Sequence, residues 1–223
     1  MNGAGVVARS TVRALLRRRA AIAMLVAMPL VFYLSRHDAV GQSIRSLVFG
    51  ISWAASTVAF FAAVAAQEVE PRLGLAGWPG RVLVGGRLAG LLAVGGAISA
   101  GFFVLVAVDR DVASLGAVAV DFAVTMVVAV AFGTALGSVV HRELEGALAI
   151  FFVAGLQATV NPYAGAAKLL PFWSSREIAT VSVDGPRAAS LSAGLLHAAV
   201  VIILCAGVVA AARISRPAPL RAG

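Results

Sequence analysis

The sequence predicts an all-α integral membrane protein. Of its 223 residues, 61% are hydrophobic and only 13% are charged, whereas about a quarter of the residues in a soluble domain are charged. The mean hydropathy of +0.96 and the long uncharged runs between clusters of charge are typical of helices that cross a bilayer. A soluble enzyme is therefore excluded, and lipid is expected to be the main solvent of the chain.

The uncharged runs predict six transmembrane helices. The expected spans are 20–34, 46–67, 88–108, 122–140, 146–161 and 188–212. Most of them approach or exceed the ~20 residues that a helix needs to cross about 30 Å of hydrocarbon. The first span follows an arginine-rich stretch as a secretory signal would, but Ser35-Arg36-His37-Asp38 stands where a cleavage site with small residues is needed. We therefore expect a retained anchor.

An amphipathic interfacial helix is expected ahead of the first span, over residues 6–19. Arginines recur every four residues on one face, namely Arg9, Arg13 and Arg17. The opposite face is apolar and consists of Val12, Leu15 and Leu16. Such a helix lies in the headgroup plane, with its arginines toward anionic lipid or a soluble partner. The alternative is a simple charge cluster that sets the topology.

The distribution of charge predicts the orientation. The net charge is +8, and basic residues are twice as numerous on one side of the membrane if both termini lie in the cytoplasm. This bias is the one that the positive-inside rule predicts. No basic face is interleaved with aromatic residues, so nucleic acid is not an expected partner. Because arginine far outnumbers lysine in a chain rich in alanine, glycine and valine, we expect a bacterial cell (inner) membrane.

Two connections are expected to be partly helical. Residues 68–87 would form a cytoplasmic segment between the second and third spans, and their charges, Pro-Gly step and apolar residues predict short helical turns at the membrane surface. Residues 161–187 would lie outside. The cluster Leu169-Leu170-Pro171-Phe172-Trp173 is too apolar for a solvated loop, so we expect a short re-entrant or interfacial helix with Trp173 as an interfacial anchor.

The chain lacks the residues for a motor or a catalytic centre of its own. Its one lysine, Lys168, is not in a phosphate-binding GxxxxGK[ST] pattern, and its one cysteine, Cys205, excludes an internal disulfide. No GxSG-type serine is available to partner His197. Asp109 and Asp111 are expected to be solvated loop charges. The sequence therefore predicts no enzymatic activity, no metal site and no cofactor in this chain.

Polar residues within the spans are expected to have structural roles. Asp121 is expected at the outer interface, just before a fourth span that starts at Phe122. His197 would lie near the midplane of the last span, where an interhelical hydrogen bond is expected, and Gln157 is interpreted in the same way. A proton or substrate role for His197 is the alternative. Gly133 and Gly137 predict close helix packing on one face of the fourth span.

The order of several features resembles the permease subunit of type-2 ABC exporters. The motifs are Met28-Pro29-Leu30 in the first span, Glu68 and Glu70 ahead of Trp78-Pro79 and Arg87, and Leu170-Pro171-Phe172-Trp173 ahead of the last span. The likeness covers nearly the whole chain. At Pro71-Arg72 this chain departs from the family, whose members usually have a Gly-Thr step there.

The resemblance implies a motor on another chain. Two copies of an ATP-binding cassette ATPase subunit would bind ATP and Mg, and this chain would pair with a second permease chain as a homodimer or heterodimer. Residues that would transmit nucleotide-driven closure are Glu68, Glu70, Arg72, Trp78 and Arg81. Residues that would line the transport path are Trp53, Ser56, Thr57 and Phe60 on the second span and Phe151, Phe152 and Gln157 on the fifth. The alternative for the first set is helix capping, and for the second set contact with other helices or lipid.

The resemblance favours a permease for an amphipathic, drug-like or lipid-like substrate, since the path would be aromatic with few hydroxyls. The alternative is an ATPase-independent protein, either a secondary carrier or a structural subunit of a membrane assembly. A carrier is expected to have inverted repeats, broken helices or an ionisable pair at the midplane, and the sequence has no clear repeat. The exporter subunit is therefore the favoured hypothesis.

Overall fold

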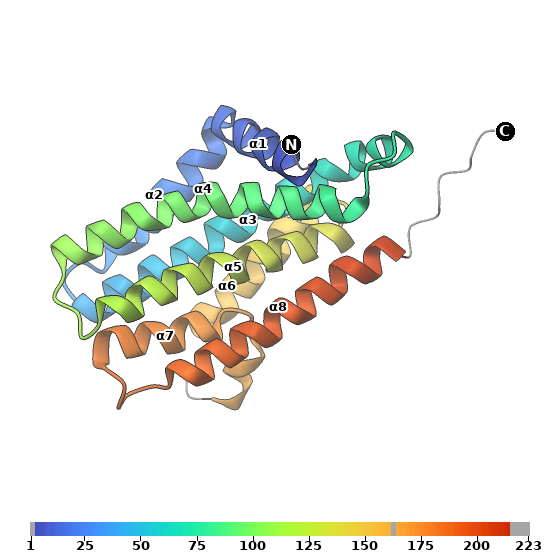
Figure 1. The fold of residues 1–223 in the computed structure, drawn as a ribbon. Coiled ribbons are helices and arrows are strands. Elements are labelled where there is room, and N and C mark those ends of the chain that lie inside the picture. Colours follow the sequence, from blue (N-terminus) through green and yellow to red (C-terminus); the bar gives the residue numbers. More distant parts are fainter. Residues whose placement is uncertain (1–2, 162–163, 215–223) are drawn as a thin grey trace.

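The computed structural model describes residues 3–161 and 164–214, and all regular structure within them is helical. The helices are α1 (Gly3–Arg17), α2 (Arg19–Ser35), α3 (Val40–Leu75), α4 (Gly80–Asp109), α5 (Leu115–Val139), α6 (Glu143–Thr159), the 3₁₀ helix η1 (Gly165–Leu169), α7 (Trp173–Asp184) and α8 (Leu191–Ile214). The long helices lie side by side in one bundle, with α8 at its edge (Figure 1). The expected all-α fold is confirmed.

Four helices of the described chain, α3, α4, α5 and α8, are long and apolar enough to cross a membrane. They contain 24 to 36 residues, which exceeds the ~20 residues of a single crossing. The two other expected spans correspond to α2 and α6, which have 17 residues each. Length and composition therefore identify a membrane-embedded protein and four of its six expected spans.

Glycines let the central helices approach closely, as the sequence predicted for Gly133 and Gly137. A Cβ atom on Gly133 would lie 2.1 Å from the carbonyl oxygen of Ser56, and one on Gly137 would lie 2.8 Å from that of Phe60. The backbones of α3 and α5 are therefore in direct contact. This contact forms the centre of the core, because no larger residue fits between the two helices.

We expect the change Gly133→Ala to destabilise the protein by about 1–3 kcal/mol, because the new methyl group would collide with the α3 backbone. The matched control is Gly101→Ala on α4, where a Cβ would meet nothing within 4 Å and the substitution gains helix propensity. Thermal unfolding in detergent, followed by size-exclusion chromatography, measures both. Equal melting temperatures for the two variants would contradict the close α3–α5 packing.

The connection between α3 and α4 differs from the expected set of short helical turns. Helix α3 continues to Leu75 and α4 begins at Gly80, so most of residues 68–87 extend the two long helices. Gly77, with φ of 85°, ends α3. Its amide donates to Gly74 O at 3.0 Å and the Trp78 amide donates to Leu73 O at 3.0 Å, which is a Schellman motif. The connection is therefore a tight turn with a defined geometry.

Asp121 lies inside a helix, and the expected start of that helix at Phe122 is wrong. Ser114 caps α5 by accepting a hydrogen bond from the amide of Ala117, so the helix begins at Leu115, well before the expected start at Phe122. Asp121 is fully buried. Its Oδ1 accepts a hydrogen bond from Thr125 at 3.2 Å, one turn farther along the same helix.

The segment between α6 and α8 contains short helices, as expected. Within its described residues, η1 and α7 are helical; α7 packs against α3, α5 and α8, and η1 contacts α7. Trp173 was expected to be an interfacial anchor, but its side chain is buried at the start of α7 and its ring contacts that of His197, with centroids 5.2 Å apart. The segment is therefore part of the packed core and also contributes to the end of the bundle.

Candidate functional site

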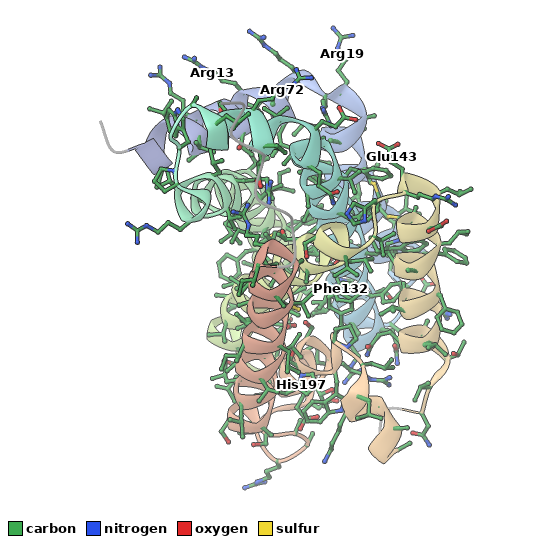
Figure 2. The ribbon with its side chains drawn as sticks, turned by 90° about the vertical axis from the view of Figure 1, so that its right-hand side faces the viewer. Arg13, Arg19, Arg72, Phe132, Glu143 and His197 are labelled. Atoms are coloured by element: carbon green, nitrogen blue, oxygen red, sulfur yellow. The ribbon has the colours of Figure 1, made fainter. Side chains whose placement is uncertain are left out.

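The charged side chains gather at the two ends of the bundle. We call the end that holds the turn between α3 and α4 the α3–α4 end, and the end that holds the turn between α2 and α3 the α2–α3 end. Arg13, Arg19 and Arg72 project together from the α3–α4 end, whereas His197 lies toward the other (Figure 2). The α3–α4 end contains the residues that sequence analysis assigned to contact with an ATPase.

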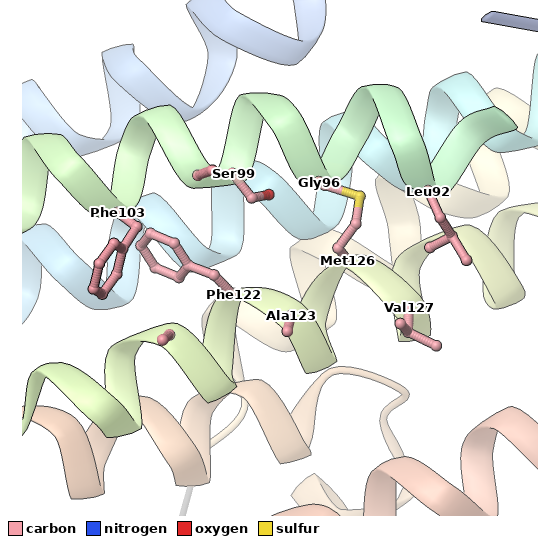
Figure 3. A pocket seen from close by; sticks show the side chains of 10 residues that line it. Leu92, Gly96, Ser99, Phe103, Phe122, Ala123, Met126 and Val127 are labelled. Carbon is pink, nitrogen blue, oxygen red and sulfur yellow. The ribbon is translucent and has the colours of Figure 1, made fainter. Parts of the chain in front are cut away.

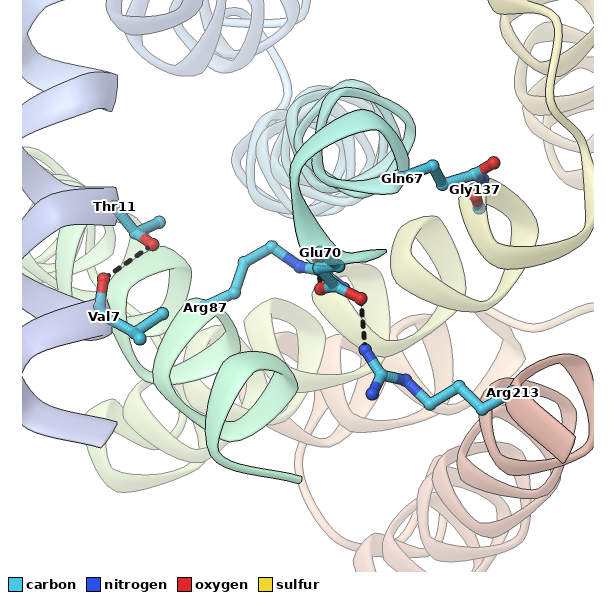
Figure 4. Close-up of polar contacts among 7 residues, drawn as sticks. All are labelled: Val7, Thr11, Gln67, Glu70, Arg87, Gly137 and Arg213. Atoms are coloured by element: carbon cyan, nitrogen blue, oxygen red, sulfur yellow. Dashed lines mark hydrogen bonds and ion pairs between the residues drawn. The ribbon is translucent and has the colours of Figure 1, made fainter. Parts of the chain in front are cut away.

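Glu70 is the centre of an ion-pair cluster at the α3–α4 end. Its Oε1 lies 2.5 Å from Nη1 of Arg87 on α4, and its Oε2 accepts a hydrogen bond from Nη2 of Arg213 on α8 (Figure 4). Glu70 and Arg87 are largely buried, with side-chain exposures of 13% and 11%. A carboxylate in such a place needs positive partners, and here the partners come from two other helices. Glu70 therefore joins α3, α4 and α8.

Neighbouring contacts reinforce this junction. Gln67, one turn before Glu70, donates from its amide nitrogen to the carbonyl of Gly137 at the end of α5 (Figure 4). Helix α1 packs against the first turns of α4, where a Cβ on Gly86 would lie 2.6 Å from Val7 and one on Gly90 would lie 2.7 Å from Thr11. The α3–α4 end is therefore a joined assembly of α1, α3, α4, α5 and α8.

The five residues expected to contact an ATPase have different surroundings. Glu68, Arg72 and Arg81 are exposed. Trp78 is half-buried, with its ring over the start of α1 near Gly3. Glu70 is bound within the chain. Three of the five are therefore free to meet another protein, Trp78 is partly available, and Glu70 holds the fold together.

Arg87 and Arg213 are the site residues that sequence analysis did not assign. Arg87 entered only as part of a family motif, and Arg213 was given no role. Arg213 lies 143 residues from Glu70 along the chain, so no local pattern connects them. The one feature of the sequence that could have pointed to these arginines was Glu70 itself, since a carboxylate close to a long apolar helix requires a cation nearby.

Glu70→Gln is expected to destabilise the protein by about 3–5 kcal/mol, because it leaves the buried guanidinium of Arg87 without its counter-ion. The control Glu68→Gln removes the same charge from an exposed position two residues away, and its effect is expected to stay within about 0.5 kcal/mol. The midpoint of thermal unfolding in detergent distinguishes the variants. A Glu70→Gln protein as stable as the Glu68→Gln control would exclude the proposed role of the cluster.

The residues expected to line a transport path fall into two groups. Ser56 and Phe60 are fully buried and Thr57 nearly so. The two hydroxyls donate to carbonyl groups of their own helix, Ser56 to Ser52 and Thr57 to Trp53, and the ring of Phe60 fills the space beside Gly146 of α6. This group belongs to the interior of the bundle.

The second group lies at the surface of the bundle. Trp53 contacts Phe151 with ring centroids 5.5 Å apart, and Phe151 and Phe152 are 59% and 65% exposed. Leu144 and Leu148 extend the same exposed face of α6. An apolar helix face of this kind meets either lipid or another apolar helix. Within one chain, then, α3 and α6 bring Trp53 and Phe151 together, leave Phe152 exposed beside them, and hold the other path residues inside.

His197 forms the expected hydrogen bond to another helix, and its partner is a backbone carbonyl group. Its Nε2 lies 2.9 Å from the carbonyl oxygen of Lys168 in η1. This bond joins α8 to the segment before α7. Gln157 is buried at 8% exposure on α6, and its Oε1 has no hydrogen-bond partner within the described residues. The two residues therefore differ, since only His197 forms the expected hydrogen bond, although its Nδ1 has no partner among the described residues.

A pocket of 420 Å³ lies between α4 and α5 (Figure 3). Its wall includes Gly96, Phe103, Phe122 and Met126, and Ser99 is its one hydroxyl-bearing residue. No charged side chain is among the described residues that line it. A recess with this lining suits an acyl chain or another apolar group. It lies on different helices from the residues assigned to the transport path.

Together, the apolar helices, their glycine-mediated contacts and the charges at both ends define a polytopic α-helical membrane protein. The class is established by the fold and by the composition of its helices. The sequence matches no model of a known protein family and no curated protein.

Proposed function

We propose that this chain is the membrane-spanning permease subunit of an ABC-type exporter in a bacterial inner membrane. It works as a dimer with itself or a related chain and binds two ATPase subunits on the cytoplasmic side. ATP binding and hydrolysis in those subunits rock the two permease chains against each other, and the substrate moves outward between them. In this proposal no residue of the chain performs covalent chemistry, and the partner binds ATP and Mg.

The observation that carries the proposal is the arrangement at the α3–α4 end. Three charged side chains, Glu68, Arg72 and Arg81, are exposed around a tight turn, while Glu70 ties the same turn to α4 and α8. A partner that pushes on these exposed charges would therefore move several helices as one body. This is the mechanical property that a coupling element between a motor and a permease needs.

The contacts of α2 and α6 support six crossings. Helix α2 starts beside the α1–α4 contact and ends where Tyr33 donates a hydrogen bond to Asp109, the last residue of α4. Helix α6 starts beside Phe60 and ends near the first turns of α3. Helix α6 thus runs along the first half of α3. The 17 residues of α2 and of α6 measure about 26 Å. If the bilayer becomes locally thinner around them, as it does around short hydrophobic helices, both helices are long enough to cross it.

The exposed aromatic face of α3 and α6 supports a path between two chains. Phe151 and Phe152 point away from their own bundle, and Trp53 backs them. Two such faces opposite each other would make an aromatic channel with few hydrogen-bonding groups, which suits an amphipathic, drug-like or lipid-like substrate. In this arrangement the buried residues Ser56, Thr57 and Phe60 support the wall from behind.

One observation favours a second candidate, a proton-coupled secondary carrier. Asp121 is fully buried and its Oδ2 has no hydrogen-bond partner among the described residues. Intramembrane carboxylates are frequent in proton relays. The two candidates differ in their need for an ATPase, so one experiment distinguishes them.

The experiment is affinity purification of the tagged chain from its native membrane in mild detergent. We expect a soluble ATPase to co-purify, and we expect the triple change Glu68→Ala, Arg72→Ala and Arg81→Ala to remove it, because these side chains are exposed at the proposed contact. Each lost interfacial charge pair typically costs about 2 kcal/mol or more, so the triple variant should retain under a tenth of the ATPase.

The matched control is Arg187→Ala, an exposed arginine at the opposite end of the bundle, which should retain the ATPase in full. Glu70 is left unchanged because its loss would weaken the fold. If the wild-type chain purifies alone under gentle conditions, the exporter is overturned and the carrier becomes the better candidate.

A further inference from the structure

A second pocket, distinct from the one between α4 and α5, opens at the α2–α3 end. It has a volume of 600 Å³ and is bordered by α2, α3, α6 and α7. Its lining is divided between aromatic side chains, Phe32, Phe49 and Phe172, and basic ones, Arg36, Arg45 and Arg176. We call it the arginine–phenylalanine pocket. A cavity with separate apolar and cationic parts fits a ligand with the same division.

The aromatic part is held in place by ring contacts. Phe32 and Phe49 meet edge to face, with centroids 5.2 Å apart, and each lies 6.1 Å from the ring of Trp53. Phe172 packs edge to face against Phe132 of α5, with centroids 5.6 Å apart. These rings come from three different helices or turns and fix an apolar floor, which would accept a hydrocarbon chain.

The cationic part has an excess of positive charge. Among the described residues that line the pocket none is acidic, and one of its arginines, Arg45, pairs with Asp184 at 2.5 Å. The side chain of Arg36 is exposed at the mouth and forms no ion pair within the described chain. A planar guanidinium at the mouth of a partly apolar cavity favours a phosphate or carboxylate.

Two buried polar atoms on the pocket wall have no partner among the described residues. They are Oε1 of Gln157 and Oγ of Ser175, and their residues are 8% and 2% exposed. Buried polar atoms are hydrogen-bonded in the great majority of cases, and neither atom is accessible in this structure, so each side chain must rotate toward the cavity before a ligand can complete it. Oε1 of Gln157 is an acceptor, and it needs a donor such as a hydroxyl group.

We propose that the arginine–phenylalanine pocket binds an anionic amphiphile whose headgroup also carries hydroxyl groups. The acid would meet Arg36 and its neighbours, a headgroup hydroxyl would donate to Gln157, and the hydrocarbon would lie on Phe32 and Phe49. Binding requires neither an ATPase nor a second chain, so the inference stands apart from the proposed transport activity. Only the placement of the pocket in the outer leaflet rests on the proposed orientation.

The test measures the fluorescence of Trp53 in the purified full-length chain, with Trp78→Phe and Trp173→Phe to remove the other indoles. Brominated phosphatidylglycerol and brominated phosphatidylcholine, which quench a nearby indole, are titrated separately in detergent micelles. We expect phosphatidylglycerol to quench Trp53 with about tenfold higher affinity, the effect of one charge-assisted contact. Equal affinity for the two lipids would overturn the inference.

Variants at each part of the pocket locate the effect. Arg36→Gln should reduce the preference for phosphatidylglycerol to about twofold, and Gln157→Leu should weaken phosphatidylglycerol binding several-fold. The control Arg13→Gln removes the same charge from an exposed position at the other end of the bundle and should leave the tenfold preference intact. A preference that survives Arg36→Gln but disappears in Arg13→Gln would assign the binding to another surface.

A last arm distinguishes an amphiphile from a free anion. Glycerol 3-phosphate, which has the acid and the hydroxyls without the hydrocarbon, should not displace brominated phosphatidylglycerol at a hundredfold higher concentration. If glycerol 3-phosphate displaced the lipid at a comparable concentration, the aromatic floor would contribute nothing to the affinity. The inferred ligand would then be a soluble anion and not an amphiphile. Circular dichroism of each variant verifies that the helices are retained.

Discussion

The Glu70 carboxylate, held between Arg87 and Arg213, is the interaction on which the α3–α4 end of the structure depends. Burying an unpaired charge at the end of a long apolar helix costs free energy. In this chain arginines from two other helices pair with Glu70. The pairing fixes the end of α3 against α4 and α8. It also leaves the neighbouring charges, Glu68 and Arg72, exposed on a surface that the cluster holds rigid.

The opposite end is fixed by a comparable device. Tyr33 donates a hydrogen bond to Asp109, and Arg110 donates from Nε to the Tyr33 hydroxyl at 3.0 Å. His37 completes the group, with its Nε2 3.3 Å from Asp109. Between the two polar ends, the α3–α5 contact through Gly133 and Gly137 joins backbones directly. A bundle tied in this way is suited to rigid-body motion, since its ends and its centre move together.

Hydropathy was sufficient to predict an all-helical membrane protein and the approximate positions of its helices. The small-residue face on α5 was also predictable, because glycines four residues apart allow close approach. Helix boundaries predicted from the positions of charged residues were wrong where the charged residue is buried. Asp121 was placed at a membrane surface because carboxylates are rare in hydrocarbon, yet the Ser114 cap starts α5 earlier and carries Asp121 into the core.

The candidate site was less predictable than the fold. Sequence alone located the charged turn at 68–87, but it did not separate Glu70, which is bound internally, from Glu68, which is exposed. That difference depends on Arg213, which is remote in the chain. The residues expected to line the path were also separated by contacts that are remote in the chain. The helical spacing of Trp53, Ser56 and Phe60 does not reveal that α5 covers Ser56 and that α6 covers Phe60.

The account requires the two ends of the bundle to lie on opposite sides of the membrane, with α3 and α6 both crossing. Single cysteines at four exposed positions, Asp38, Ala76, His141 and Ala188, test this in a Cys205→Ala background. A membrane-impermeant maleimide should label positions 38 and 188 in intact cells, and positions 76 and 141 only after the membrane is permeabilised. Labelling of 76 and 38 from the same side would contradict the account, because α3 alone separates them.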